Sequence, residues 1–453
     1  MDARATRLQL LNLRTIPMRT FHLAWMAFFV CFFAWFAVAP LMPLIRDDLG
    51  LTREQIANIN IAAVCVTIFV RLLIGPLCDR YGARLAYTWL LAIGALPVFA
   101  IAFAQTYEAF LFCRLCIGAI GASFVITQVH TSTMFAPNVV GTANATAAGW
   151  GNAGGGATQA FMPLLVAAIV AIGVEQRFGW RIALFVPGVL MLIMAVLYYR
   201  FAKDTPFGNL KDAGVRMKSG EVQRKKGWDT FKIAARDYRV WLLFVTYGAC
   251  FGVELTIHNL AALYYVDRFG LSLATAGMYV GAFGLLALFA RALGGLASDS
   301  LAASRGLDAR VSLLFVLILA EGLGLIGFAQ MNHAVPALVT MLIFGLFTHM
   351  ACGATYSLVP FINRKALGGV AGIVGAGGNV GAVLAGFLVR EAPSTHRALL
   401  LLGIIVTVSA LCALAVRFTR EQKAEERSQF EEALAARSQT EAQAQPLQST
   451  AGS

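Results

Sequence analysis

Twelve long apolar stretches follow one another along the 453-residue chain, and they constrain its fold more than any other feature. Each is close to the 20 or so mainly apolar residues that an α-helix needs to cross a bilayer. With 58% hydrophobic and 13% charged residues, the chain could not cover its apolar surface in water. The sequence therefore predicts an all-α integral membrane protein, solvated by the lipid bilayer. The twelve predicted spans are residues 21–45, 55–75, 84–105, 108–134, 140–172, 180–201, 239–266, 273–297, 309–331, 335–357, 368–389 and 397–416.

Basic residues predict the orientation, because Lys and Arg are enriched in cytoplasmic loops. Arg4, Arg7, Arg14 and Arg19 precede the first span, and an even number of spans returns the chain to the same side. We therefore expect a multi-pass protein of the cell membrane with both termini in the cytoplasm. The net charge of +12 is explained by such loops and does not indicate a nucleic-acid partner.

The longest loop divides the chain into six plus six spans. We predict a cytoplasmic N-terminus (1–20), a first six-helix bundle (21–201), a linker (202–238), a second six-helix bundle (239–416) and a cytoplasmic tail (417–453). The linker is rich in Lys and Arg, which favours the anionic surface of the inner leaflet and a short amphipathic helix. In the tail we expect one short helix near 421–437 and then disorder. The tail is either solvated or a docking site for a regulatory partner.

Two short patterns recur between the halves. Arg71-x-x-x-Gly75-x-x-x-Asp79 returns 220 residues later as Arg291-x-x-x-Gly295-x-x-x-Asp299. Gly151-Asn152-x-Gly154 returns 227 residues later as Gly378-Asn379-x-Gly381. The first pattern lies on spans two and eight and the second on spans five and eleven, which are equivalent in a six-plus-six repeat. Two parallel halves are therefore predicted.

The loop after span two resembles a known signature. Gly75-Pro-Leu-Cys-Asp79-Arg80-Tyr-Gly82-Ala-Arg84 is similar to the loop between spans two and three of major-facilitator transporters. The resemblance implies a major-facilitator fold, with a substrate site near the midplane between the halves. It also implies cytoplasmic gate contacts for Asp79 and Arg80, within a gate motif of Gly75, Asp79, Arg80, Gly82, Arg84, Gly295 and Asp299.

Arg71 and Arg291 each precede a cytoplasmic-end Asp by eight residues, which places them about 12 Å inside the membrane. An Arg at such a depth costs about 2.5–3.5 kcal/mol on insertion scales. Snorkelling to the interface or pairing with a buried carboxylate would explain them, but snorkelling from this depth is awkward. We interpret them as a pair, one per half, that binds an anionic substrate through planar bidentate donors.

The glycine runs around Gly151 and Gly378 predict close helix packing. The spacing G-x-G-x-x-G at Gly149 has no preceding strand, so it does not indicate a dinucleotide site. Packing alone does not explain Asn152 and Asn379, whose amides either bind the anion or bond to a neighbouring helix.

The stretch from Thr146 to Gln159, TAAGWGNAGGGATQ, resembles the nitrate signature of the nitrate/nitrite porter family, especially its plant and cyanobacterial high-affinity branch. Similar matches occur at 375–381, 252–256 and 291–295. The resemblance implies nitrate as the substrate, with nitrite as a second candidate, clamped by Arg71 and Arg291. It also implies aromatic rings stacked on the planar ion. The residues that fall on these rings are Phe124 on span four, Tyr247 on span seven and Phe347 on span ten.

Glu254 is the one acidic residue deep inside span seven, and His258 follows one turn later. An intramembrane carboxylate indicates either a proton relay or an ion pair with a cavity Arg. Glu254 and His258 are therefore the proton-coupling candidates, with His130 on span four as a further one.

We expect proton-coupled nitrate uptake for assimilation, by alternating access. The alternatives are a nitrate/nitrite antiporter, an organic-anion antiporter and a transport-fold nitrate sensor. No metal-ligand cluster, cofactor motif or nucleophile–base pair stands out, so we predict no enzyme, no metal and no cofactor. The partners that we expect are nitrate or nitrite, protons and the lipid bilayer.

Overall fold

The computed structural model describes residues 4–136, 139–209, 227–363, 366–424 and residue 427. Within them, twelve helical segments are long and apolar enough to cross a membrane, as the sequence predicts. The predicted helical stretch at 421–437 lies mostly outside the described residues; a helix covers 420–424. The all-α membrane fold is thus confirmed.

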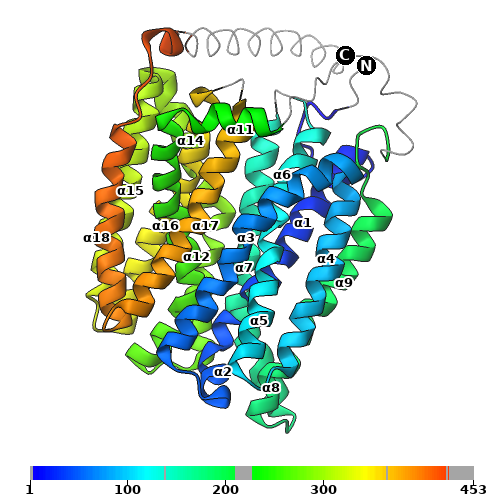
Figure 1. Ribbon diagram of the computed structural model, residues 1–453, viewed down its shortest axis with the longest axis vertical. Helices are drawn as coiled ribbons and strands as arrows, with labels where there is room; N and C mark the ends of the chain where they lie inside the picture. Colours follow the sequence, from blue (N-terminus) through cyan, green and yellow to red (C-terminus); the bar gives the residue numbers. More distant parts are fainter. Residues whose placement is uncertain (1–3, 137–138, 210–226, 364–365, 425–426, 428–453) are drawn as a thin grey trace, which may run out of the picture.

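The twelve spans form two bundles that stand side by side (Figure 1). The helices of the first bundle are α1 (Ile16–Phe36), α2 (Met42–Leu49), α3 (Arg53–Tyr81), α4 (Ala83–Ala100), α5 (Tyr107–Ile117), α6 (Ser123–Met134), α7 (Val140–Ala171), α8 (Gln176–Ala183) and α9 (Phe185–Phe201). Those of the second are α12 (Tyr238–Phe269), α13 (Leu273–Leu285), α14 (Ala287–Arg305), α15 (Leu307–Ala329), α16 (Ala334–Ile362), α17 (Leu367–Glu391) and α18 (Thr395–Leu414). Between them, the linker contains the expected short helix, α11 (Gly227–Ala235).

Four spans are broken, and span six is one of them, divided at Leu184 between α8 and α9. Pro40 and Pro43 interrupt span one, where a 3₁₀ turn (Ala39–Leu41) joins α1 to α2. In span four, a 3₁₀ segment (Gly118–Ala122) joins α5 to α6, and its glycines allow close contacts: a Cβ on Gly118 would lie 2.8 Å from the Ala63 carbonyl oxygen. Span eight is divided at Leu286, between α13 and α14. Such breaks leave backbone carbonyls free of regular helical bonds.

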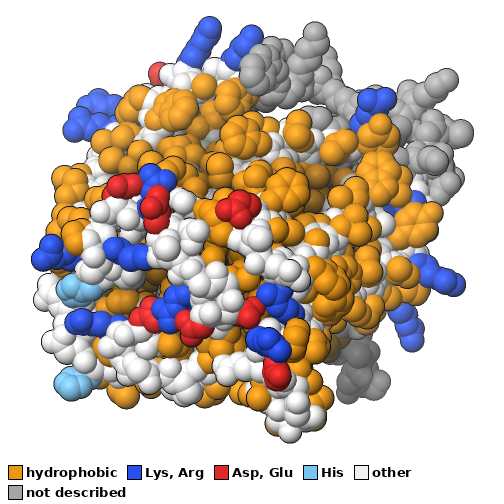
Figure 2. All heavy atoms as spheres, turned by 60° about the horizontal axis from the view of Figure 1, so that its bottom comes forward, with side chains coloured by type: hydrophobic (Ala, Val, Ile, Leu, Met, Phe, Trp, Pro, Cys, Tyr) orange, Lys and Arg blue, Asp and Glu red, His pale blue; other side chains and the backbone are white. Residues whose placement is uncertain are grey.

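We call the end of the bundles where α1 begins and α18 finishes the terminal end, and the opposite end, with α2 and α8, the far end (Figure 1). At the far end, Lys, Arg, Asp and Glu side chains gather, while hydrophobic side chains cover much of the flank (Figure 2). Leu96, Phe103, Phe112, Val196 and Leu384 are among the large apolar side chains that are more than 60% exposed. Lipid would solvate such a surface.

The two bundles are pressed together in the half of the molecule nearer the far end. Here α7 packs on α13 and α14, and α3 packs on α17. A Cβ on Gly156 of α7 would lie 2.6 Å from the backbone of Gly284 in α13. Towards the terminal end, a Cβ on Gly75 of α3, Gly295 of α14 or Gly372 of α17 would meet no atom of the described residues within 4 Å. Among the described glycines, those in close contact across the two bundles therefore lie away from the terminal end.

Candidate functional site

Arg71 reaches from the first bundle to the second. Its Nη1 donates to the carbonyl of Gly375 on α17, and its Nη2 donates to the carbonyl of Gly121 in the 3₁₀ segment of span four, both at 3.3 Å. The guanidinium carbon lies 5.6 Å from the centre of the Phe124 ring. Both hydrogen bonds are long and go to neutral acceptors, so the positive charge of Arg71 is left without an ionic partner among these contacts.

Arg291 occupies the corresponding place on α14 and is held more firmly. Its Nη2 forms a 2.5 Å ion pair with Glu254 Oε2, and both side chains are buried. Its guanidinium carbon lies 5.4 Å from the Phe251 ring centre. Of the two interpretations of Glu254, the structure shows the ion pair with a cavity Arg. The other carboxylate oxygen, Oε1, has no hydrogen-bond partner in the described residues.

His349 on α16 is a second neighbour of this carboxylate that the sequence analysis did not identify. Its Nδ1 lies 3.3 Å from Glu254 Oε2, and the ring is completely buried. A polar ring in the apolar run of span ten was the available signal, since intramembrane ionisable groups are functional candidates. Glu254 thus lies between a permanent cation and a titratable ring.

His258 lies one turn along α12 from Glu254. It packs between Phe36 and Phe283, with ring centres 4.9 and 5.7 Å away, at the tight contact of the bundles. His130 belongs to another region: its ring nitrogens bond to the Tyr198 hydroxyl and the Lys203 carbonyl within the first bundle. Proton roles for Glu254 and His258 stay predictions.

A chain of aromatic rings joins the two arginines. From the Arg71 side, Phe124 is followed by Tyr356, whose ring centre is 6.5 Å away, and then by Tyr247 at 5.1 Å. Phe251 stacks on Tyr247 at 5.3 Å and completes the chain to Arg291.

On span ten, the aromatic ring that contacts the other rings is Tyr356 and not the expected Phe347. Phe347 is partly buried in the core, and in the described residues it makes no ring contact with Phe124 or Tyr247. Tyr356 lies nine residues further, about 13.5 Å along α16, and it contacts both rings. Tyr356 and Phe251 were not expected, because neither belongs to a repeated motif or to the rings that the family resemblance implies.

The repeated Gly-Asn pairs occupy related places in the two bundles. A Cβ on Gly151 would collide with the Phe28 ring, and a Cβ on Gly378 would collide with the Phe251 ring. Glycine is therefore required where these side chains pack against the helix. Asn152 is buried, and neither its Oδ1 nor its Nδ2 has a partner in the described residues. Asn379 donates only a 3.5 Å bond to the Gly375 carbonyl, the same carbonyl that Arg71 contacts.

The gate-motif residues lie at the terminal end. Gly82 has a φ of 90°, and a Cβ there would run into the Asp204 carboxylate, which accepts the Arg84 backbone N–H at 2.9 Å. Arg80 is exposed and lies over Tyr81. In the second bundle, Asp299 pairs with Arg310 at 2.5 Å. The Asp79 side chain lies outside the described part of the structure.

Comparison with known proteins agrees with this architecture. The sequence profile of the Major Facilitator Superfamily matches residues 24–363. The chain is 39% identical over 417 residues to the high affinity nitrate transporter 2.5 of Arabidopsis thaliana, covering 92% of this chain and 82% of that protein. It is 41% identical over 369 residues to nitrate transporter 2.1 of Chlamydomonas reinhardtii, covering 81% and 67%. A nitrate/nitrite transporter of Nostoc punctiforme, NrtP, is 29% identical over 89% of this chain and 93% of its own length.

Among solved structures, a bacterial homolog of the human lysosomal transporter Spinster, in an inward-facing and unoccupied conformation, superimposes with a TM-score of 0.70. It is 14% identical, and the match covers 92% of this chain and 99% of that one. The inward open xylose transporter XylE from E. coli gives a TM-score of 0.68 at 13% identity, covering 91% and 99%. At these identities the likeness concerns the fold alone.

Proposed function

We propose that this chain, which belongs to the Major Facilitator Superfamily and within it to the nitrate/nitrite porter family, carries nitrate across a membrane by alternating access. As a multi-pass protein of a transporter family, it is not an enzyme. The observation that carries the proposal is the pair of arginines, one per bundle, of which Arg71 is partly buried and Arg291 is buried, joined by four aromatic rings. The nitrate transporters named above are relatives at up to 41% identity, which supports nitrate as the cargo.

Each part of the site suits a small planar oxyanion. Arg71 and Arg291 present fixed fork-shaped donors that match two oxygens of such an ion. The aromatic faces can stack on its plane, and the unpartnered Asn152 amide can donate to a third oxygen. Because Arg71 and Arg291 come from different bundles, an ion bound to both draws the bundles together on the terminal side.

Alternating access follows from the contacts between the bundles. Among the described glycines, those in close contact across the bundles lie away from the terminal end. With both termini in the cytoplasm, as proposed from the basic loops, the described state faces the cytoplasm. Binding on the opposite face requires the far-side contacts to part and the terminal side to close.

Moving one anion into a cell against an inside-negative potential costs about 2.3 kcal/mol per 100 mV. Concentrative uptake therefore requires a coupled ion, and we propose protons, since nitrate itself is too weak a base to bring one. The Glu254–His349 pair beside Arg291 supports this, because it places titratable groups next to the anion site. Exchange of nitrate for internal nitrite is the alternative, and the Nostoc punctiforme relative NrtP is named as a nitrate/nitrite transporter.

One experiment tests the proposal and separates these modes. The purified protein is reconstituted into liposomes, and uptake of labelled nitrate is measured with equal nitrate on both sides, then with an acid-outside pH gradient, then with internal nitrite. Exchange in the first condition and accumulation in the second are expected. Accumulation with internal nitrite alone would establish antiport, and the absence of nitrate exchange in every condition would refute the function itself.

A further inference from the structure

Another arginine, Arg114, lies on the far side of Arg71 and Arg291. Arg114 on α5 is completely buried. Its Nη1 donates to the carbonyl of Trp35 in α1, and its Nη2 donates to Asn259 Oδ1 on α12 at 2.9 Å. Its Nε has no hydrogen-bond partner in the described residues. Arg114 therefore connects the two bundles through Asn259, in the region where they are in close contact.

The hydrogen bonds of Arg114 do not explain its charge. Both acceptors are neutral, and neither hydrogen bond pairs the guanidinium with a carboxylate. A neutral amide makes a comparable connection one residue away, where Gln159 Nε2 of α7 donates to the His258 carbonyl at 2.6 Å. Because burying an unpaired charge is costly, a permanent cation in place of an amide requires a further reason.

The place where Arg114 of α5 contacts α12 suggests a role for its charge. Its partner Asn259 lies about 7.5 Å from Glu254, which holds Arg291, and about 12 Å from Asp267, near the far end. Asp267 binds Arg46. Three arginines, Arg46, Arg114 and Arg291, therefore contact α12 in that order from the far end to the midplane. Arg46 and Arg291 are paired with carboxylates, whereas Arg114, between them, is not.

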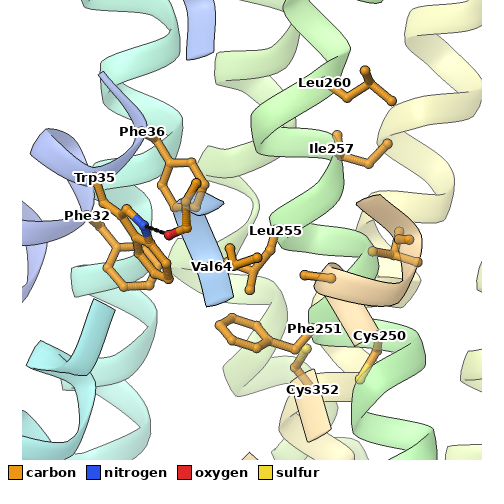
Figure 3. Packing of buried hydrophobic residues seen from close by; sticks show 14 of the residues in the cluster. Phe32, Trp35, Phe36, Val64, Cys250, Phe251, Leu255, Ile257, Leu260 and Cys352 are labelled. Carbon is orange, nitrogen blue, oxygen red and sulfur yellow. Dashed lines mark hydrogen bonds between the residues drawn. The ribbon is translucent and has the colours of Figure 1, made fainter. Parts of the chain in front are cut away.

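A small cavity beside Asn259 shows that this region is not fully packed. It has a volume of about 20 Å³, enough for one water, and Asn60, Thr256 and Asn259 provide its polar atoms. Figure 3 shows the neighbouring apolar contact, with Val64 of α3 between Trp35 and Leu255 of α12. Separation of the bundles here would release Arg114 from Asn259 and open it to the entering ion.

We propose that Arg114 is an outer binding residue for the small oxyanion. When the bundles part at the far end, its guanidinium leaves Asn259, receives the anion and passes it to Arg71 and Arg291. Closure of the far end restores the bond to Asn259 and leaves the anion on the central pair. This inference rests on the proposed transport function and adds a second binding position to it.

The test is equilibrium exchange of labelled nitrate in liposomes, with the half-saturating concentration and the maximal rate measured separately. Arg114→Gln removes the charge but keeps an amide donor, and we expect the half-saturating concentration to rise about tenfold at an almost unchanged maximal rate. Asn259→Ala is the matched control, because it breaks the connection between the bundles and leaves the charge. Its half-saturating concentration should stay within about twofold of the wild type.

The opposite pattern would overturn the proposal. If Arg114 only locks the bundles together, both variants change the maximal rate alike and neither changes the half-saturating concentration. Should Arg114→Gln fail to fold, Arg114→Lys is tested instead. If Arg114 binds the anion, the retained charge keeps the half-saturating concentration within about threefold of the wild type. If Arg114 only connects the bundles, the weakened connection lowers the maximal rate. Protection of each variant against thermal unfolding by nitrate reports on the central site. A wild-type protein without nitrate exchange would instead refute the transport function.

Discussion

At the scale of single residues, Arg71 and Arg291 are set apart by what holds them. The hydrogen bonds of Arg71 go to two neutral carbonyls at 3.3 Å, whereas Arg291 forms an ion pair with the buried Glu254. Arg71→Lys should therefore weaken nitrate binding without unfolding the protein. Loss of one charged hydrogen bond costs about 1.5–3 kcal/mol, or roughly a 10- to 150-fold weaker affinity. Nitrate protection against thermal unfolding measures this affinity, and an unchanged value would remove Arg71 from the site.

Arg291→Ala is expected to lower the stability of the protein, which Arg71→Lys should not do. It leaves the Glu254 carboxylate buried beside His349 without its cation, and removing one partner of a buried pair costs about 3–5 kcal/mol. Thermal unfolding without nitrate should show the loss for Arg291→Ala and not for Arg71→Ala. The double variant Arg291→Ala with Glu254→Gln should recover much of the stability, because no uncompensated charge remains. Equal stability of the two single variants would contradict the assigned difference.

The sequence could predict the charged residues of the site, whereas of its four aromatic rings only Phe124 and Tyr247 were expected, and those from the family resemblance. A buried Arg is conspicuous in an apolar span, and its repetition 220 residues later identifies the pair. Phenylalanine and tyrosine are ordinary packing residues in such spans. Which of them line the site depends on the rotation of each helix and on the breaks at Gly118–Ala122 and Leu286. Tyr356 could therefore not be preferred over Phe347 before the helices were placed.

At the scale of elements, the spans were predictable because the bilayer fixes their length and apolar character. Breaks within spans were not, since prolines and glycines in membrane helices often leave the helix intact. The close contact of α7 with α13 likewise could not be predicted from the sequence. Gly156 and Gly284, which make it, lie 128 residues apart in the chain and belong to different bundles.

Gly156→Ala tests what this contact does. The added methyl would lie 2.6 Å from the backbone of Gly284, so the bundles must move apart on the far side. We expect a shift towards the state that is open at the far end. Distances between spin labels at the exposed positions Asp47 and Glu391, one on each bundle, should lengthen.

Gly118→Ala is the matched control for that experiment. Its methyl would lie 2.8 Å from the Ala63 carbonyl oxygen, but within the first bundle. It should lower thermal stability and leave the label distances unchanged. If Gly118→Ala lengthens the distances as Gly156→Ala does, the change reflects general loosening and the contact has no specific role in closing the far end.

At the scale of the whole molecule, the far end is held by an ion pair between the bundles. Arg46 Nη1 contacts both oxygens of Asp267 at 2.7 and 2.8 Å, and both side chains are partly exposed. Exposed pairs contribute about 0–1 kcal/mol, so Asp267→Asn should shift the ratio of the two states by at most about fivefold. The same spin-label distances report the shift. Molar salt should produce the same shift between the two states in the wild type and have little effect on Asp267→Asn. A wild type whose label distances do not change with salt would contradict the role of the Arg46–Asp267 pair at the far end.

Coupling between ions is also a property of the whole molecule, because it links a proton to the movement of both bundles. In the described state Arg291 holds Glu254 as its anion. Nitrate bound between Arg71 and Arg291 offsets part of that positive charge, so Glu254 and His349 together should then take up a proton more readily. Thermodynamic linkage makes this reciprocal: a proton on the pair strengthens nitrate binding by the same factor.

Glu254→Gln removes the carboxylate from that linkage and keeps the shape of the side chain. The variant should bind nitrate and exchange it, since Arg71 and Arg291 keep their charges, but it should no longer accumulate nitrate under an acid-outside pH gradient. Wild-type nitrate affinity should rise as the pH falls, and that of Glu254→Gln should change little. Cys352→Ser, which alters another neighbour of the same carboxylate, is the control and should retain accumulation. Accumulation by Glu254→Gln at the wild-type level would exclude the carboxylate as the coupling group, and His349→Gln would then show whether the ring beside it carries the proton alone.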